Sequence, residues 1–265
     1  MSVYRLAALG LALSFFGAGC FSVDLRPTSI EFPDGIPIVV QPAAEWKTVG
    51  PDVEQRIEMV SPSSTARVTL YRFAPSTVDL DFVHSTSVGS IIDWQKAYPD
   101  AIAILNGAYF DEESVPAGYF RSEGERIGSR AFDFDKSAFF IGDATPRIIE
   151  VKSEAELKNM KSILQSYPLL VQDGQAVVQT DSGKLARRSF VGFDLSKNLY
   201  LGIVDGGGIS LYELSQYLQR TGVSWTSALN LDGGPSTGLS INVKDLQEVT
   251  DSWTLIPNVI IVKKR

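Results

Sequence analysis

Three apolar runs in this sequence end in the same way, with an acidic or amide side chain followed at once by glycine. They end at Asn106-Gly107, at Asp205-Gly206-Gly207-Gly208 and at Asp232-Gly233-Gly234. A buried strand that ends in Asp or Asn places that side chain at the rim of a sheet, and glycine lets a ligand approach the backbone closely. Asp-Gly and Asn-Gly are also common turn dipeptides, so each instance alone fits an ordinary turn. The recurrence favours a functional site, with Asp232 as its leading carboxylate.

Charged side chains near these runs indicate that the site binds an anion. Asp111 follows Asn106 at a short distance along the chain, while Arg187 and Arg188 precede an apolar run at residues 190–193. Adjacent arginines usually lie on a solvated surface. The planar guanidinium group nevertheless matches a phosphate or a carboxylate, so one arginine of this pair pointing inward would hold such a group.

Several other chemistries are excluded by the residue inventory. His84 is the only histidine and Cys20 the only cysteine, which rules out a His-rich zinc site and a Cys-His catalytic pair. Residues 234–238 match the Gly-x-Ser-x-Gly pattern of serine hydrolases around Ser236. A strand rather than a helix is expected after this pattern, however, and the histidine lies upstream of the serine. The glycines at 206–208 have the spacing of neither a dinucleotide fingerprint nor a phosphate loop.

The elements that must position these residues are mostly short strands. Alternation and compact apolar runs predict strands at residues 56–60, 66–73, 78–83, 101–105, 138–141, 169–171, 199–204, 228–231, 239–243 and 259–262. Helices are predicted after the capping boxes Ser153/Glu156 and Ser210/Glu213, and at residues 87–98. This pattern predicts a single α+β domain, with a mixed, strand-rich sheet and about three helices.

An export signal is predicted before this domain. Arg5 precedes an apolar run at residues 6–16, and small residues then lead to Cys20, as in a bacterial lipoprotein signal. We therefore expect a signal peptide over residues 1–19, lipidation of Cys20, a tether over residues 20–44 and the folded domain over residues 45–265. Gly17 stands where such signals usually carry leucine, which leaves simple cleavage and secretion as the alternative.

The predicted cellular location and the net charge of the chain limit the partners that we expect for it. A lipid anchor on Cys20 would hold the protein at the bacterial cell envelope, in the periplasm or at the outer membrane where there are two membranes. The formal net charge of −7 argues against nucleic acid as a partner. Because the domain after Cys20 contains no cysteine, it forms no disulfide and depends on its core for stability.

Several motifs, taken in order, resemble the phosphodiester glycosidase family. They are Asn106-Gly107-Ala108-Tyr109-Phe110-Asp111, Pro116-Ala117-Gly118, the run at residues 165–171, Arg188-Ser189, and Asn230-Leu231-Asp232-Gly233-Gly234-Pro235-Ser236. The similarity spans about Glu45 to the C-terminus. It implies hydrolysis of a sugar-1-phosphodiester at the anomeric carbon, which releases the sugar and leaves a phosphomonoester. Pro235 stands where a third glycine is usual in the family, and it removes one backbone N–H from the turn.

For this reaction the candidate residues receive distinct expected roles. Asp232 is the nucleophile or base, Asp205 is its runner-up, and Asp111 is an orienting partner. Arg188 holds the phosphate. The remaining candidates would position the sugar or the phosphate, in part through an anion nest of backbone N–H groups, and they are Asn106, Gly107, Gly206, Gly207, Gly233, Gly234 and Ser236.

Two alternative functions would use the same loops. One is a non-catalytic lipoprotein that binds a phosphate-containing glycopolymer. The other is a metal-assisted phosphodiesterase, in which Asp111, Asp205 and Asp232 supply oxygen ligands to a hard divalent cation. The sequence predicts no particular cofactor for the glycosidase and leaves a divalent cation open. The enzyme's expected partner is a phosphodiester of an exopolysaccharide or another glycoconjugate.

Overall fold

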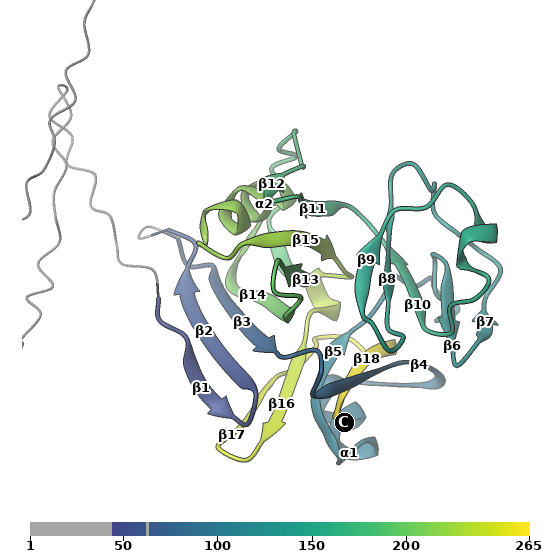
Figure 1. Cartoon of the computed structure of the whole chain (residues 1–265), viewed down its shortest axis with the longest axis horizontal. Helices are drawn as coiled ribbons and strands as arrows, with labels where there is room; N and C mark the ends of the chain where they lie inside the picture. Colours follow the sequence, from purple (N-terminus) through teal and green to yellow (C-terminus); the bar gives the residue numbers. More distant parts are fainter. Residues whose placement is uncertain (1–43, 62–63) are drawn as a thin grey trace, which may run out of the picture. The chain divides into compact units, whose positions relative to one another are not determined.

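The computed structural model describes residues 44–61 and 64–265 of the chain (Figure 1). The predicted signal peptide at residues 1–19, Cys20 and nearly all of the predicted tether lie outside these residues. In the described part, no helix is long and apolar enough to cross a membrane.

Three antiparallel sheets make up the fold (Figure 1). The first sheet has the spatial order β1 (Lys47–Gly50), β2 (Val53–Met59), β3 (Arg67–Phe73), β14 (Leu199–Ile209), β13 (Ala186–Asp194), β15 (Trp225–Asn230), β11 (Leu169–Gln172) and β12 (Gln175–Ala176). The second has the order β7 (Glu125–Ile127), β6 (Phe120–Ser122), β10 (Ile163–Ser166), β8 (Ala138–Ile141) and β9 (Arg147–Ile149). The third has the order β17 (Leu246–Thr250), β16 (Leu239–Val243), β5 (Ala101–Asn106), β18 (Ile256–Lys264) and β4 (Val78–Gly89).

The predicted α+β class with a mixed sheet and three helices is therefore wrong: the described chain is mostly β. Its only α-helices are α1 (Ile91–Ala97) and α2 (Leu211–Arg220). Every strand pair in these sheets is antiparallel. Parallel pairing needs long crossover connections, usually helical, and a chain with two short helices supplies few of them.

The two capping boxes have different outcomes. Ser210 and Glu213 bond each other's backbone N–H groups at 3.0 and 3.1 Å and begin α2, as predicted. Ser153 and Glu156 begin only the 3-10 turn η1 (Glu154–Leu157). A capping box satisfies the first N–H groups of a helix, but continuation requires an apolar face that packs. Leu214 and Leu218 provide that face in α2, where both are fully buried.

The main hydrophobic core joins all three sheets. It contains Val191 from the first sheet, Phe140 from the second, and Leu105 and Ile260 from the third, each of them fully buried. Strand β5 therefore packs close to β13 and β15, although these strands belong to different sheets. Their ends, where the sequence places its polar residues, are brought to one place.

Candidate active site

The turn after β15 is held against the end of β5 by backbone and side-chain hydrogen bonds. The backbone N–H of Asp232 donates to the carbonyl of Gly107 at 3.2 Å. The Asn106 Nδ2 donates to the carbonyl of Asp232 at 2.8 Å, and its Oδ1 accepts from Ser189 Oγ at 2.5 Å and from the Gly238 N–H at 3.2 Å. Asn106, predicted to bind substrate, thus has both polar atoms bonded within the protein. Its contacts position the Asp232 turn.

The Asp232 carboxylate is partly buried and has no cationic partner among the described residues. Its Oδ1 accepts the Gly233 N–H at 2.8 Å, and the Ser236 hydroxyl also hydrogen-bonds to it. Burial raises the pKa of Asp232 above its ordinary value, although these two hydrogen bonds oppose the shift. Gly234 has a positive φ of 61° and opens the short 3-10 turn η2 (Gly234–Ser236), which places Ser236 beside the carboxylate. A carboxylate in this environment is a stronger base than an ordinary aspartate.

Arg188 lies beside this turn and is not paired with a carboxylate in the described part of the chain. Its Nε donates to the carbonyl of Ile209 at 3.0 Å, and its Nη2 donates to the carbonyl of Lys184 at 2.8 Å. These bonds use two of the five guanidinium N–H groups and leave Nη1 for a ligand. Burial lowers the pKa of Arg188, which is the sign of a cation withdrawn from water.

Gly233 makes the close approach between the turn and β13 feasible. A Cβ at this position would lie 2.9 Å from the carbonyl oxygen of Arg187 and 3.7 Å from the Cδ of Arg188. The first of these contacts is with backbone, which has little freedom to move. Glycine is required here for the Asp232 turn to pack against β13 next to Arg188.

An aromatic group that was not among the predicted site residues completes the cluster. Asn230, fully buried at the end of β15, donates to the Tyr109 hydroxyl at 2.7 Å and to the carbonyl of Tyr167 at 3.0 Å. The rings of Tyr109 and Tyr167 stack with centroids 5.1 Å apart, and Phe132 packs edge-on against Tyr167. Burial, and then the charge of Asp232, raise the pKa of Tyr109, so its phenol remains a proton donor.

Another residue missed by sequence reasoning, Asn258 on β18, holds the turn after β5. Its Oδ1 accepts the Ala108 N–H at 2.6 Å, and its carbonyl accepts the Gly107 N–H at 3.1 Å. A Cβ on Gly107 would lie 2.2 Å from that Oδ1. Gly107 is therefore needed for packing against the protein. Tyr109, Tyr167 and Asn258 all lie within segments that resemble the family. That resemblance is the feature of the sequence that could have identified them.

The other two predicted carboxylates are engaged elsewhere. Asp205 forms a two-bond ion pair with Arg67, at 3.0 and 2.8 Å. Asp111 pairs with Arg130 at 2.7 Å and also accepts two backbone N–H groups of its own turn. Within residues 44–61 and 64–265, no group of three or more potential metal ligands comes together. Asp111, Asp205 and Asp232 therefore do not form the single ligand set that the metal-assisted alternative requires.

The glycines after Asp205 also pack against protein. Gly206 has a positive φ of 86°, and a Cβ there would lie 2.4 Å from the carbonyl oxygen of Thr65. A Cβ on Gly207 would lie 1.9 Å from the Thr65 Oγ1. These glycines, predicted to line an anion nest, accommodate the neighbouring segment at residues 64–66.

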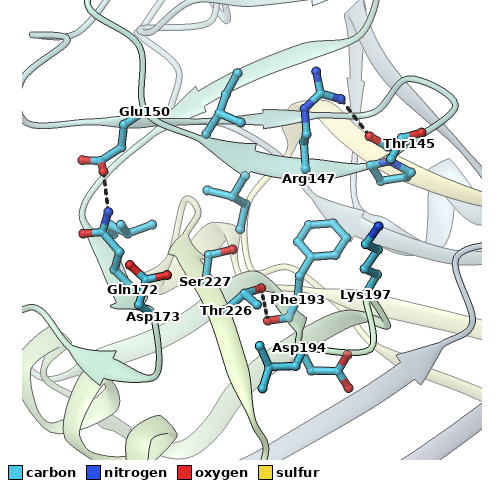
Figure 2. A pocket seen from close by; sticks show the side chains of 15 residues that line it. Thr145, Arg147, Glu150, Gln172, Asp173, Phe193, Asp194, Lys197, Thr226 and Ser227 are labelled. Carbon is cyan, nitrogen blue, oxygen red and sulfur yellow. Dashed lines mark hydrogen bonds between the residues drawn. The ribbon is translucent and has the colours of Figure 1, made fainter.

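A separate cleft of about 440 Å³ lies at the opposite ends of β13 and β15. Figure 2 shows its apolar floor at Phe193, with Arg147 and Lys197 on one side and Glu150 and Gln172 on the other. Phe193 pairs with Ser227, whereas Phe190 pairs with Asn230 beside the Asp232 turn. None of the predicted site residues lines this cleft.

Comparison with known proteins identifies the family. The sequence profile of the phosphodiester glycosidases matches residues 99–263. The fold is similar to the catalytic domain of zebrafish N-acetylglucosamine-1-phosphodiester alpha-N-acetylglucosaminidase, with a TM-score of 0.64 and 17% identity over 84% of this chain and 87% of that one. It is also similar to a hypothetical protein from Synechocystis, with a TM-score of 0.59 and 16% identity over 87% of this chain and 65% of that one.

A search of curated proteins gives no match by sequence. The family profile alone covers more than half of the chain, and its span includes the Asp232 turn, Arg188 and the Tyr109 segment. The protein belongs to the phosphodiester glycosidase family.

Proposed function

We propose that this protein hydrolyses a sugar-1-phosphodiester at the anomeric carbon, acting outside the cytoplasm on a glycoconjugate or an exopolysaccharide. The observation that carries the proposal is that two oppositely charged side chains lie at the Asp232 turn and that neither has a counter-ion in the described part of the chain. The partly buried Asp232 carboxylate has no cationic partner in the described residues, and the nearby Arg188 has no acidic one. A substrate with a cationic reacting centre and an anionic leaving group complements both.

The leaving group explains why one carboxylate suffices. A phosphomonoester departs readily as an anion, so cleavage of the C–O bond requires little help from a general acid. The site must instead stabilise positive charge at the anomeric carbon and supply a nucleophile or a base on its open face. Asp232 serves this role, and the burial that raises its pKa also makes it more basic. Overall, water adds its oxygen to the sugar, and its protons pass to the sugar hydroxyl and to the departing phosphate or solvent.

Arg188 and Tyr109 orient the two halves of the substrate. The free Nη1 of Arg188 donates to phosphate oxygens in the Michaelis complex and as charge develops on the leaving group. The Tyr109 and Tyr167 rings offer an apolar wall against which the scissile sugar packs. Ser236 keeps the Asp232 carboxylate aligned.

The proposal is tested by incubating the purified full-length protein with sugar-1-phosphodiesters of several sugars in water enriched in heavy oxygen. Catalytic release of sugar, with the label in the sugar, supports it. Label in the phosphate would instead indicate P–O cleavage, and stoichiometric binding without turnover would indicate a glycopolymer-binding protein. The anomeric configuration of the product separates the two roles of Asp232, because retention indicates a nucleophile and inversion a base.

The cellular location is part of the proposal. The apolar run before Cys20 and the small residues next to it support export, with lipid attachment at Cys20. Incorporation of a labelled fatty acid that disappears in Cys20→Ser would support the anchor, whereas an unlabelled, secreted wild-type protein would contradict it.

A further inference from the structure

A large aromatic side chain projects from the loop that leads from β17 to β18. Trp253 is 75% exposed. Its backbone N–H donates to the carbonyl of Pro235 at 2.7 Å. The preceding Asp251 caps the loop, because its Oδ1 accepts the N–H groups of Ser252 at 3.0 Å and Ile92 at 3.1 Å. The indole is thus presented to solvent by a backbone that is fixed on several sides, and it offers a large, flat apolar surface on which a ligand can pack.

Arg187 supports this ring from beneath. Its guanidinium carbon lies 4.3 Å from the centroid of the Trp253 ring, a cation–π contact that fixes the orientation of the indole. Arg187 is only 7% exposed, and its Nη2 donates to the carbonyl of Asp251 at 3.1 Å. Its buried Nη1 has no hydrogen-bond partner in the described residues. A buried donor without a partner costs free energy, and this one lies beneath the ring, away from the exposed face of the indole.

The platform formed by Trp253 over Arg187 lies close to the Asp232 turn. Pro235, to which Trp253 is bonded, follows Asp232 by three residues, which span at most about 11 Å of backbone. Arg187 and the proposed phosphate ligand Arg188 are neighbours in β13, so their side chains leave opposite faces of this strand next to the Asp232 turn. The Tyr109 wall, by contrast, contacts Asn230, on the other side of Asp232 in the chain. A substrate whose scissile sugar packs on the Tyr109 wall and whose phosphate meets Arg188 would extend its leaving group toward Trp253.

We propose that Trp253 is a specificity-determining residue that stacks on a sugar ring of the leaving group, beyond the phosphate. This inference rests on the proposed function. A pyranose ring has an apolar face of C–H groups that packs on the exposed face of an indole, while its hydroxyl groups remain at the edge in water. The preferred substrates are therefore diesters that join two sugars through phosphate, and simple alkyl diesters of the same sugar are poorer.

The test compares two diesters of one scissile sugar, prepared for glucose, mannose and N-acetylglucosamine. In one the second alcohol is methanol, and in the other it is the 6-hydroxyl of methyl glucoside. Both release an alkyl phosphomonoester of similar basicity, so the comparison isolates binding. We expect Trp253→Ala to lower kcat/KM about tenfold on the two-sugar diester and less than about twofold on the methyl diester. Trp253→Phe should restore part of the loss.

Leu195→Ala is the matched control, because Leu195 is 74% exposed and lies at the separate cleft. It should leave both diesters unaffected. An equal loss on both diesters, or no loss on the two-sugar diester, would overturn the role of Trp253. Because the indole lies outside the core, the thermal midpoint of Trp253→Ala should remain near that of the wild type.

Failure of the proposed function gives a different result. If the wild-type protein hydrolyses neither diester, the enzymatic proposal fails, and binding of the same two compounds is then measured by titration calorimetry. Weaker binding of the two-sugar diester alone in Trp253→Ala would still support the platform. Equal binding of that diester by the variant and the wild type would overturn it.

Discussion

Asp205 and Asp232 look alike in the sequence and differ in the structure. Both follow an apolar run and precede at least two glycines, but Asp205 lies within β14, whereas Asp232 lies in the turn after β15. Asp205 accepts hydrogen bonds from the Nε and Nη2 of Arg67, whose side chain is half exposed. Asp232 is partly buried, and its carboxylate receives only a backbone N–H and a hydroxyl. The Asp205 carboxylate is occupied by its ion pair, whereas burial without a cationic partner raises the pKa of Asp232 and makes it more basic. The partner, more than the Asp-Gly-Gly motif, distinguishes a candidate catalytic group from a structural one.

The glycines that follow the two aspartates differ in the same way. Gly206 and Gly207 allow the β14 backbone to pass close to Thr65. Gly233 allows the Asp232 turn to approach Arg187 and Arg188. One motif therefore accommodates a neighbouring segment, and the other lets the Asp232 turn pack against the β13 backbone at the two arginines.

The largest expected effect separates the two carboxylates. Asp232→Asn should lower kcat for sugar release by at least about 10³-fold, because the amide is neither a base nor a nucleophile. Asp205→Asn, the matched control, should change kcat less than about threefold, since it loses an ion pair outside the proposed reaction. Both rates are measured on the best sugar-1-phosphodiester found for the wild-type protein.

Folding has to be followed alongside these rates. The amide oxygen introduced by Asp232→Asn can still accept the Gly233 N–H, so the thermal midpoint of this variant should not fall. A large loss of stability would make Asp232 a structural turn residue, and comparable loss of activity in both variants would remove the distinction between them.

A smaller effect is expected from the cation. Arg188→Ala should reduce kcat/KM on phosphodiesters about 10²-fold, as for removal of one donor to developing charge. An aryl glycoside of the same sugar carries no phosphate, so any turnover of it should change less than about threefold. Similar losses on both substrates would show that Arg188 shapes the turn and does not bind the anion.

Many individual strands and one helix start could be predicted from short stretches of sequence, but the way in which these elements assemble could not. Strands such as β8 and β16 and the start of α2 follow from apolar runs and a capping box, which are contained in a few residues. The number of sheets and their antiparallel pairing depend on contacts between distant segments: β4 pairs with β18, at the other end of the described chain. Ser153 and Glu156 gave a correct helix start but no information on length, because continuation depends on tertiary packing.

The same distinction between local motifs and long-range contacts applies to the candidate site. The sequence placed Asp232, Gly233 and Arg188 in one group, because their motifs could be recognised one by one. The ion pair of Asp205 with Arg67 spans 138 positions, and the contact of Asn230 with Tyr109 spans 121. Such partners decide which polar residues are engaged, and no local pattern encodes them. One arginine of the pair was expected to point inward, yet Arg187 is buried beneath Trp253 while Arg188 lies beside the turn.

The subtlest expected difference between the two carboxylates is in the pH dependence of stability. Because burial raises the pKa of folded Asp232, the folded state keeps a proton that the unfolded state has already released. The resulting stabilisation is complete in acid, below the unfolded pKa near 3.8, and is lost as the pH rises toward the folded pKa. Asp232→Asn removes this dependence, so its thermal midpoint should equal that of the wild type in acid and exceed it at neutral pH.

Melting curves of the wild type, Asp232→Asn and Asp205→Asn between pH 3 and pH 8 measure this difference. For Asp205 the substitution removes the ion pair with Arg67, so it should bring no gain at neutral pH. If Asp232→Asn were less stable than the wild type at neutral pH and equal to it in acid, Asp232 would be stabilised as an anion. The buried, uncompensated carboxylate on which its proposed reactivity depends would then be absent.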